Sequence, residues 1–167
     1  LIPSIKNVVI VNYPGKKFIK NYQKLKKQNF FKWTDCIKKN PQEIKFKNYD
    51  FESKLAILYS SGTTGKPKCI CHRAGGVLLQ HLKEHQLHSE IKQNDNVFYF
   101  TTCGWMMWNW LVTALSSKAS IVLFEGFPMY KRDDLLIKLA DEEKITLFGV
   151  SAKYIDSLNK SKILNKK

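Results

Sequence analysis

The feature that most constrains the fold is a regular alternation of short apolar segments with longer amphipathic ones beyond Asp50. Short apolar runs with turn signals on either side are typical of strands, and apolar residues at three- and four-residue spacing are typical of helices. Strands joined by helices pair in parallel through right-handed crossovers. The sequence therefore predicts an α/β fold with a parallel sheet. We predict strands at residues 55–59, 68–72, 96–102, 120–125 and 145–150, and helices at 73–88, 104–117, 133–143 and 151–159.

Two of these helices have a predicted buried face, and the last one has a predicted cap. Ser151 is a residue type that caps helix N-termini. The expected buried residues of the helix at 73–88 are Val77, Leu78, Leu82 and His85, and those of the helix at 104–117 are Met107, Trp110, Leu111, Ala114 and Leu115.

The first fifty residues have a different character. Val8–Val11 is an apolar run that reads as a buried strand, residues 15–28 read as a lysine-rich helix, and residues 30–38 as a short helix. These residues contain no motif that indicates catalysis or ligand binding. The predicted organisation is a basic lead-in segment at residues 1–50, followed at 51–167 by part of a nucleotide-binding domain.

A phosphate-binding loop is predicted at residues 59–68, YSSGTTGKPK, directly after an apolar strand. Glycine lacks a Cβ, so the backbone N–H groups at Gly62 and Gly65 can approach an anion closely. Hydroxyl groups donate hydrogen bonds to phosphate oxygens, and lysine adds positive charge. The predicted phosphate ligands are Ser60, Ser61, Gly62, Thr63, Thr64, Gly65 and Lys68, with Lys66 in a supporting role.

Two other kinds of loop have a similar composition. A polar hairpin turn without function is one, and the flanking strands together with the Pro67-Lys68 pair count against it. A Walker loop is the other, but that motif places four residues between its glycines and then runs into a helix, whereas the segment after Lys68 reads as a strand.

The sequence SSGTTGKPK resembles the phosphate-binding signature of the adenylate-forming superfamily, which comprises acyl-CoA synthetases, adenylation domains and luciferases. The segments HRAGGVLLQHLKEHQLHSEI and TTCGWMMWNWLVTALSSKASIVLFEG are similar to the acetoacetyl-CoA synthetase branch. The likeness runs from about residue 51 to residue 158, and more loosely back to Leu1. It implies that the chain is an incomplete, internal piece of the large N-terminal domain of an adenylate-forming enzyme.

The resemblance also implies an acyl pocket. In short-chain acyl-CoA synthetases a Gly-Trp pair and the two residues after it border this pocket, which points here to Trp105, Met106 and Met107. The Met-Met pair differs from the form in acetyl-CoA synthetases and favours acetoacetate as the acid. Residues 101–104 follow a predicted parallel strand, where ligand contacts usually lie.

His81, Glu84 and His85 fit the H-x-x-E-H pattern of one class of zinc peptidase, and a helix would place both histidines on one face. A zinc site needs a third ligand, for which Glu142 and Glu143 are candidates by sequence alone. Short matches of this kind arise easily by chance, so we predict no metal site here.

The net charge of +14 raises the possibility of nucleic-acid binding. Of the 28 basic residues, however, only Arg73 and Arg132 are arginines, the type that nucleic-acid surfaces recruit for bidentate and stacking contacts. We therefore expect small-molecule partners and no specific nucleic acid.

The four cysteines show no paired CxxC spacing, so we expect free, buried thiols in a reducing compartment. We find neither a signal peptide nor an apolar run long enough to span a membrane, and the default prediction is a cytoplasmic enzyme.

The resemblance implies an AMP-forming acid:CoA ligase that converts acetoacetate, ATP and coenzyme A to acetoacetyl-CoA, AMP and pyrophosphate through an acyl-adenylate, with Mg²⁺ sharing the phosphate charge. The adenine site, hinge and C-terminal lid of the superfamily are expected beyond Lys167, so the 167-residue piece alone is expected to be inactive. An inactive nucleotide-binding remnant and a basic nucleic-acid-binding module remain as alternatives.

Overall fold

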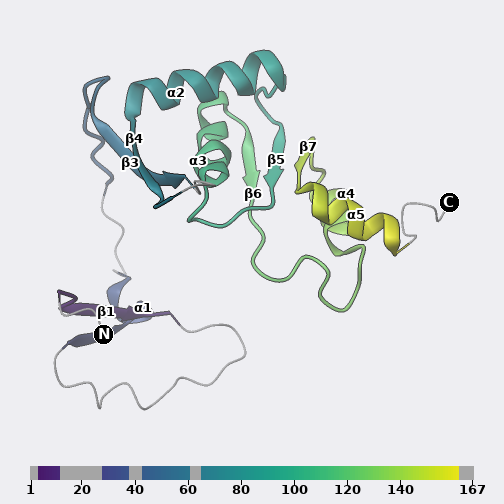
Figure 1. The fold of residues 1–167 in the computed structure, drawn as a ribbon, viewed down its shortest axis with the longest axis horizontal. Coiled ribbons are helices and arrows are strands. Elements are labelled where there is room, and N and C mark those ends of the chain that lie inside the picture. Colours follow the sequence, from purple (N-terminus) through teal and green to yellow (C-terminus); the bar gives the residue numbers. More distant parts are fainter. Residues whose placement is uncertain (1–3, 12–27, 38–42, 61–64, 162–167) are drawn as a thin grey trace. The chain divides into compact units, whose positions relative to one another are not determined.

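The computed structural model describes residues 4–11, 28–37, 43–60 and 65–161, and all structural statements below concern these residues (Figure 1). The chain divides into two compact units, Leu1–Lys47 and Asn48–Lys167.

The first unit contains one small parallel ladder. Strand β1 (Asn7–Ile10) pairs with strand β2 (Asn29–Lys32), and the four-residue helix α1 (Trp33–Cys36) follows directly. The position of the predicted first strand is confirmed to within a residue, but Val9 is 46% exposed, so the expectation of a buried strand is wrong. The predicted helix at 30–38 is wrong in its first half, because aromatic residues favour strands and Phe30 and Phe31 pair with β1. The predicted helix at 15–28 lies almost entirely outside the described residues.

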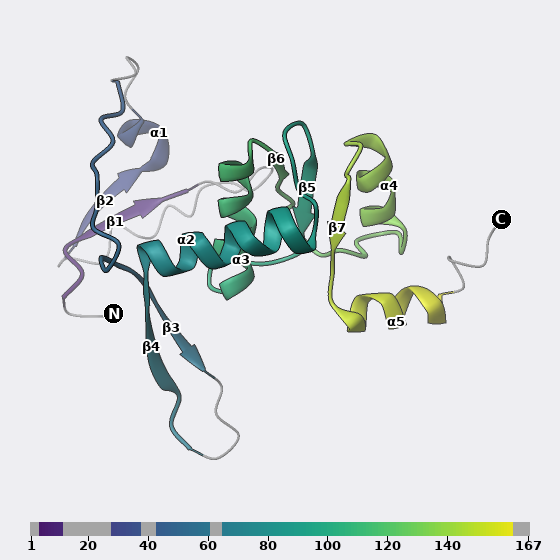
Figure 2. The ribbon, with the colours of Figure 1, turned by 90° about the horizontal axis from the view of Figure 1, so that it is seen from above.

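The second unit begins with an antiparallel hairpin. Strand β3 (Lys54–Ser60) pairs with strand β4 (Lys68–Arg73), and both match their predicted positions closely. Strand β4 runs directly into helix α2 (Ala74–Lys83), and Figure 2 shows the hairpin projecting from the start of this helix. The hairpin therefore presents its connecting loop at one end and joins a helix at the other.

A three-stranded parallel sheet forms the centre of the second unit. Its strands are β5 (Asn96–Tyr99), β6 (Ser120–Val122) and β7 (Leu147–Gly149), in the order β6-β5-β7. The crossovers contain helices α3 (Met106–Thr113) and α4 (Leu135–Glu142), and helix α5 (Ala152–Lys160) follows β7. The predicted α/β fold with a parallel sheet is confirmed, although each strand is shorter than predicted.

Both faces of the central strand are covered, because successive side chains of a strand point to opposite sides. Val97 belongs to a buried cluster with Trp110 and Leu111 of α3. The adjacent Phe98 belongs to a second cluster with Leu136 of α4 and with residues of α5. The sheet is thus sandwiched between α3 on one face and α4 and α5 on the other.

The predicted buried face of α3 is largely confirmed, with one error. Trp110, Leu111 and Ala114 are buried, but Leu115 is 52% exposed. After Thr113 the chain tightens into a 3-10 helix, η3 (Ala114–Ser117). Residues three apart eclipse one another in a 3-10 helix, so Ser117 is buried in place of Leu115.

The predicted face of α2 is also revised at its end. His85 is buried as predicted, but Leu78 is 43% exposed and His81 is buried instead. The helix widens after Lys83 into a π-helical turn, η2 (Glu84–His88), in which Ser89 N–H donates to Glu84 O. The two buried histidines lie on the side of α2 that faces α3, as the contact between His81 and Thr113 of α3 shows.

Three smaller expectations have clear outcomes. The Oγ of Ser151 accepts a hydrogen bond from Tyr154 N–H at 3.2 Å, which confirms the predicted cap of α5. The thiols of Cys36, Cys69, Cys71 and Cys103 are free as expected but exposed, so the expectation of burial is wrong. Within the described ranges, no helix is long and apolar enough to cross a membrane.

Candidate active site: a hairpin, a helix start and a cavity between them

The hairpin holds the predicted phosphate-binding loop at its open end. Ser60 and Lys68 are a cross-strand pair, the last one before the connection between β3 and β4. Ser61, Gly62, Thr63 and Thr64 lie outside the described residues. Lys68 and Gly65 are exposed, and an added Cβ at Gly65 would meet no atom within 4 Å. Of the predicted phosphate ligands, the described ones are therefore accessible at the strand ends.

A cavity of about 490 Å³ lies between the hairpin, α2 and the beginning of α3; we call it the hairpin cavity. It is bounded by the inner face of the hairpin and by one face of each helix. Its lining residues are Leu55, Ala56, Leu58, Cys71, His72 and Arg73 from the hairpin, Gly76, Val77, Gln80, His81 and Glu84 from α2 and the π-helical turn, and Met106, Asn109 and Trp110 from α3.

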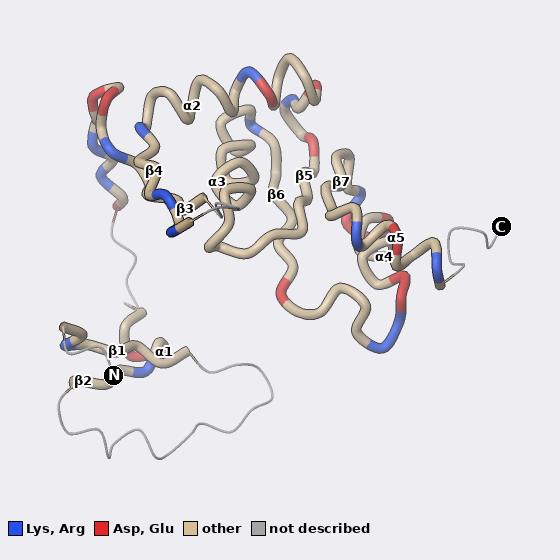
Figure 3. Tube along the Cα trace, viewed as in Figure 1, with Lys and Arg blue, Asp and Glu red and all other residues tan. Residues whose placement is uncertain are grey.

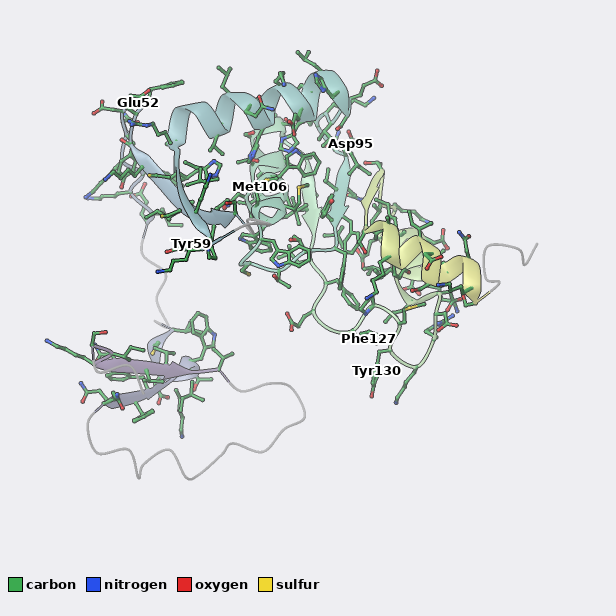
Figure 4. The ribbon with its side chains drawn as sticks, in the orientation of Figure 1. Glu52, Tyr59, Asp95, Met106, Phe127 and Tyr130 are labelled. Carbon is green, nitrogen blue, oxygen red and sulfur yellow. The ribbon has the colours of Figure 1, made fainter. Side chains whose placement is uncertain are left out.

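The three predicted acyl-pocket residues have different positions. Met106, the first residue of α3, lines the hairpin cavity and is 48% exposed. Trp105 precedes the helix and is 64% exposed, whereas Met107 packs against the buried cluster around Val97. Figure 4 shows Met106 at the start of α3 and Tyr59 near the end of β3. Of the three, only Met106 lines the hairpin cavity.

Three polar side chains that line the hairpin cavity, those of Gln80, Glu84 and Trp110, are joined by hydrogen bonds. Glu84 accepts hydrogen bonds from Gln80 Nε2 at 2.6 Å and from Trp110 Nε1 at 3.1 Å. The carboxylate thus ties α2 to α3. These two donors are neutral, and Glu84 makes no ion pair among the described residues.

His81 is 7% exposed, and its Nδ1 lies 2.8 Å from Thr113 Oγ1. The Thr113 hydroxyl donates its proton to the backbone carbonyls of Asn109 and Trp110, at 3.0 and 2.9 Å. Donation to either carbonyl leaves the Thr113 oxygen to accept from His81 Nδ1–H, and in that tautomer Nε2 of the neutral ring is an acceptor. Burial lowers the pKa of His81, with Glu84 opposing and His72 adding to the shift.

His85 lies deeper than His81. It is fully buried with its ring edge against Trp110, the two ring centroids being 4.4 Å apart, and neither ring nitrogen has a regular hydrogen bond. Burial and the neighbouring His81 lower the pKa of His85, while the Trp110 carbonyl and Glu84 oppose the shift. Both histidines are therefore held in the neutral form.

The H-x-x-E-H pattern marked a real cluster, but its members contact α3. In the part of the chain that the structure describes, no group of three or more His, Cys, Asp or Glu side chains is placed to hold a metal ion. Sequence reasoning missed Gln80 and Asn109 as cavity residues. Asn109 follows Met106 by three positions, and that helical spacing was the available signal.

A second cavity, of about 550 Å³, lies at the carboxyl ends of β5 and β6; we call it the sheet-edge cavity. Thr101, Thr102 and Cys103 line it, which are three of the four residues predicted to occupy a ligand-contact position, and the segment from Val122 to Gly126 lines its other side. No residue of the hairpin contributes to this cavity. It is thus separate from the strands that carry the predicted phosphate loop.

Positive charge is spread over the described residues of the second unit. Figure 3 shows Lys and Arg on the hairpin, the helices and the loops between them, with Asp and Glu interspersed. Three of the described basic residues form close ion pairs: Arg73 with Glu52 at 2.6 Å, Arg132 with Asp134 at 2.5 Å and Lys160 with Asp156 at 2.7 Å. The basic residues do not gather on one element.

The chain is similar to several known proteins. An acetoacetyl-CoA synthetase of Gallus gallus is 42% identical over 164 residues, which cover 97% of this chain and 25% of that protein. An acetoacetyl-coenzyme A synthetase of Rhizobium meliloti (strain 1021) is 51% identical over 115 residues, which cover 69% and 18%. The solved structure of the acetoacetyl-CoA synthetase from Streptomyces lividans aligns with a TM-score of 0.79 at 33% identity, covering 95% of this chain and 23% of that one.

The chain thus spans a quarter or less of the length of the curated relatives cited above. The match to a family model covers nearly all of it, from residue 6 to residue 167, and includes the hairpin, the cavity beside it and the parallel sheet. On this evidence the chain belongs to the family of AMP-binding enzymes.

Proposed function

We propose that this chain supplies the ATP phosphate-binding loop and part of the acyl site of an acid:CoA ligase that activates acetoacetate. Residues 51–167 would belong to the AMP-binding domain, with residues 1–50 as its lead-in. One observation carries the proposal: the strands that flank the glycine-rich loop also line the cavity into which Met106 projects. Acyl-adenylate formation requires a phosphate site next to an acyl site, and this hairpin would border both.

The reaction has two steps. A carboxylate oxygen of the acid attacks the α-phosphorus of ATP, a P–O bond forms, and the bond to the β-phosphate breaks as pyrophosphate leaves with its electron pair. The thiolate of coenzyme A then attacks the carbonyl carbon of the acyl-adenylate, and AMP departs. The first step needs the acid and the α-phosphate side by side, because positioning of the reactants lowers the barrier.

The loop residues would stabilise the charge of the phosphate chain. The hydroxyl groups of Ser60, Ser61, Thr63 and Thr64 and the ammonium of Lys68 are the donors, and backbone N–H groups at Gly62 and Gly65 add to them. Mg²⁺ would be bound chiefly by the phosphate oxygens themselves, as is usual for nucleotide-bound magnesium. The four free thiols accord with a reducing compartment such as the cytoplasm.

Binding of ATP to the 167-residue chain tests this role. Replacement of the exposed Lys68 by glutamine is expected to weaken ATP binding about 10- to 100-fold, the value of one hydrogen bond to a charged group. Lys54→Gln is the matched control, because Lys54 is also exposed and begins β3 at the opposite end of the same hairpin. Isothermal titration calorimetry with ATP and Mg²⁺ measures both.

Equal effects of the two substitutions, or no ATP binding by the unsubstituted chain, would refute the proposed phosphate site. We expect the chain alone to form no acyl-CoA, since it spans a quarter or less of its relatives' length. Acetoacetate-dependent exchange of pyrophosphate into ATP by this chain would contradict that expectation.

A further inference from the structure

The face that α3 turns to the hairpin cavity changes from apolar to polar along the helix. Met106 is its first residue, Asn109 lies one turn further on, and Thr113 holds His81 one turn beyond that. The rise from Met106 to Asn109 is about 4.5 Å, a length that a four-carbon acid spans. The cavity therefore has the apolar Met106 side chain and the helix N-terminus at one end of this face and polar groups within reach of the far end of a short acid.

Two polar groups in this cavity have no protein partner. The side-chain amide of Asn109 makes no hydrogen bond to any described residue, and its backbone carbonyl alone contacts Thr113. Nε2 of His81 is likewise unpaired within the described residues, while its Nδ1 contacts Thr113. Neither the Asn109 amide nor His81 Nε2 is among the fully buried polar atoms that lack a partner, so both stay accessible to a ligand in the cavity that can pair with them.

The two groups offer complementary chemistry. The Asn109 amide has N–H donors, whereas neutral His81 has an acceptor at Nε2. A carbonyl oxygen would pair with the amide, and a hydroxyl could donate to the imidazole. A plain hydrocarbon end would leave both groups unpaired.

Building on the function proposed above, we propose that the hairpin cavity receives the distal end of the acyl group and that Asn109 and His81 select short acids with an oxygen on C3. Asn109 donates to the C3 oxygen of a 3-oxo acid. His81 accepts from the hydroxyl of a 3-hydroxy acid. Both residues are specificity determinants of the acyl site.

Charge sets the direction in which the acid enters. Glu84 is negatively charged at the α2 end of the cavity and would repel the carboxylate of the substrate. The N-terminus of α3, at Met106, carries the positive end of the helix dipole and favours it. The carboxylate thus stays at the Met106 end, and the C3 substituent points to Asn109.

The methionines allow binding to be observed in this cavity. The chain has three, Met106, Met107 and Met129, so ¹³C-methyl labelling gives one NMR signal for each. Met106 lines the cavity, whereas Met129 packs against the buried cluster around Phe98 and serves as an internal reference. Titrations would use acetoacetate, 3-hydroxybutyrate and 3-methylbutyrate, which have the same number and branching of heavy atoms and differ only at C3.

We expect acetoacetate and 3-hydroxybutyrate to shift the Met106 signal with roughly millimolar dissociation constants, and 3-methylbutyrate to bind about tenfold more weakly. Asn109→Leu should weaken acetoacetate about tenfold and improve 3-methylbutyrate. Asn159→Leu, the same exchange at an exposed position of α5, should change neither. His81→Phe should weaken 3-hydroxybutyrate more than acetoacetate.

A Met106 signal that responds equally to all three acids, or an Asn109→Leu chain that loses all of them alike, would overturn the inference while leaving the ligase function intact. If the chain binds the acids with this selectivity but does not bind ATP, the proposed function is refuted and the inference about the cavity stands. A Met106 signal that no acid shifts, in a chain that binds ATP, would remove the acyl site from this cavity.

Discussion

The two buried histidines predict that the chain loses stability in mildly acidic solution. His81 and His85 both have pKa values lowered by burial from the usual 6.5, so the folded chain resists protonation there and the unfolded chain does not. Below about pH 6.5 the unfolded state therefore binds more protons than the folded state, and the free energy of unfolding falls as the pH falls. Above that pH the contribution of both neutral rings is fully present.

The magnitude follows from the number of protons. Each histidine that is protonated only in the unfolded state lowers the free energy of unfolding by up to about 1.4 kcal/mol per pH unit, so the pair contributes up to about 2.7 kcal/mol per unit. The loss ends once the pH passes below the folded-state pKa values. A decrease of this size corresponds to roughly 5 to 10 °C in Tm for a chain of this length.

Urea unfolding between about pH 8 and pH 5 measures how steeply the free energy of unfolding changes with pH, in a range where most carboxylates remain ionised. His85→Leu should remove about half of it, because the ring is fully buried and has no hydrogen bond to lose. His88→Leu, on the same π-helical turn but exposed, is the matched control and should leave the slope unchanged. A flat profile for the unsubstituted chain, or equal effects of the two substitutions, would refute the reasoning.

Three further predictions concern packing and capping. Gly149→Ala should destabilise the sheet by about 1 to 3 kcal/mol, because the added Cβ would overlap the ring of Tyr99, and Tyr99→Leu should relieve much of that loss in thermal unfolding of the double variant. Tyr154→Phe should raise the free energy of unfolding by about 1 kcal/mol, since the buried hydroxyl has no partner; a decrease in Tm would show that it has one. Ser151→Ala should cost about 1 kcal/mol through the lost cap, and circular dichroism melting would reveal an unaffected helix if the cap is unimportant.

The order and pairing of the elements were predictable because they depend on local pattern. The apolar runs around Val97, Ile121 and Leu147 are separated by helices, and the three strands pair in parallel as that spacing predicts. The errors arose where a neighbour distant in sequence decides the structure. Phe30 and Phe31 were assigned to a helix, but they pair with a strand more than twenty residues earlier.

The hairpin cavity also depends on contacts between residues that are distant in sequence. Helical spacing placed His81 and His85 on one face, but the residues that they contact lie on α3. Thr113 is 32 residues from His81, and Trp110 is 26 residues from the Glu84 that it contacts. No local pattern predicts that α2 packs against α3, so the contact between His81 and Thr113 could not be predicted from the sequence.

Adjacent positions on α3 have different freedom to change. Trp110 lines the cavity, belongs to the buried cluster around Val97 and donates to Glu84, so replacing it would damage the fold before it altered ligand binding. Asn109 lines the same cavity, but its side chain contributes to neither the core cluster nor a hydrogen bond. Substitution of Asn109 is therefore expected to cost little stability, whereas Trp110 and Glu84 are needed for the packing of α2 against α3.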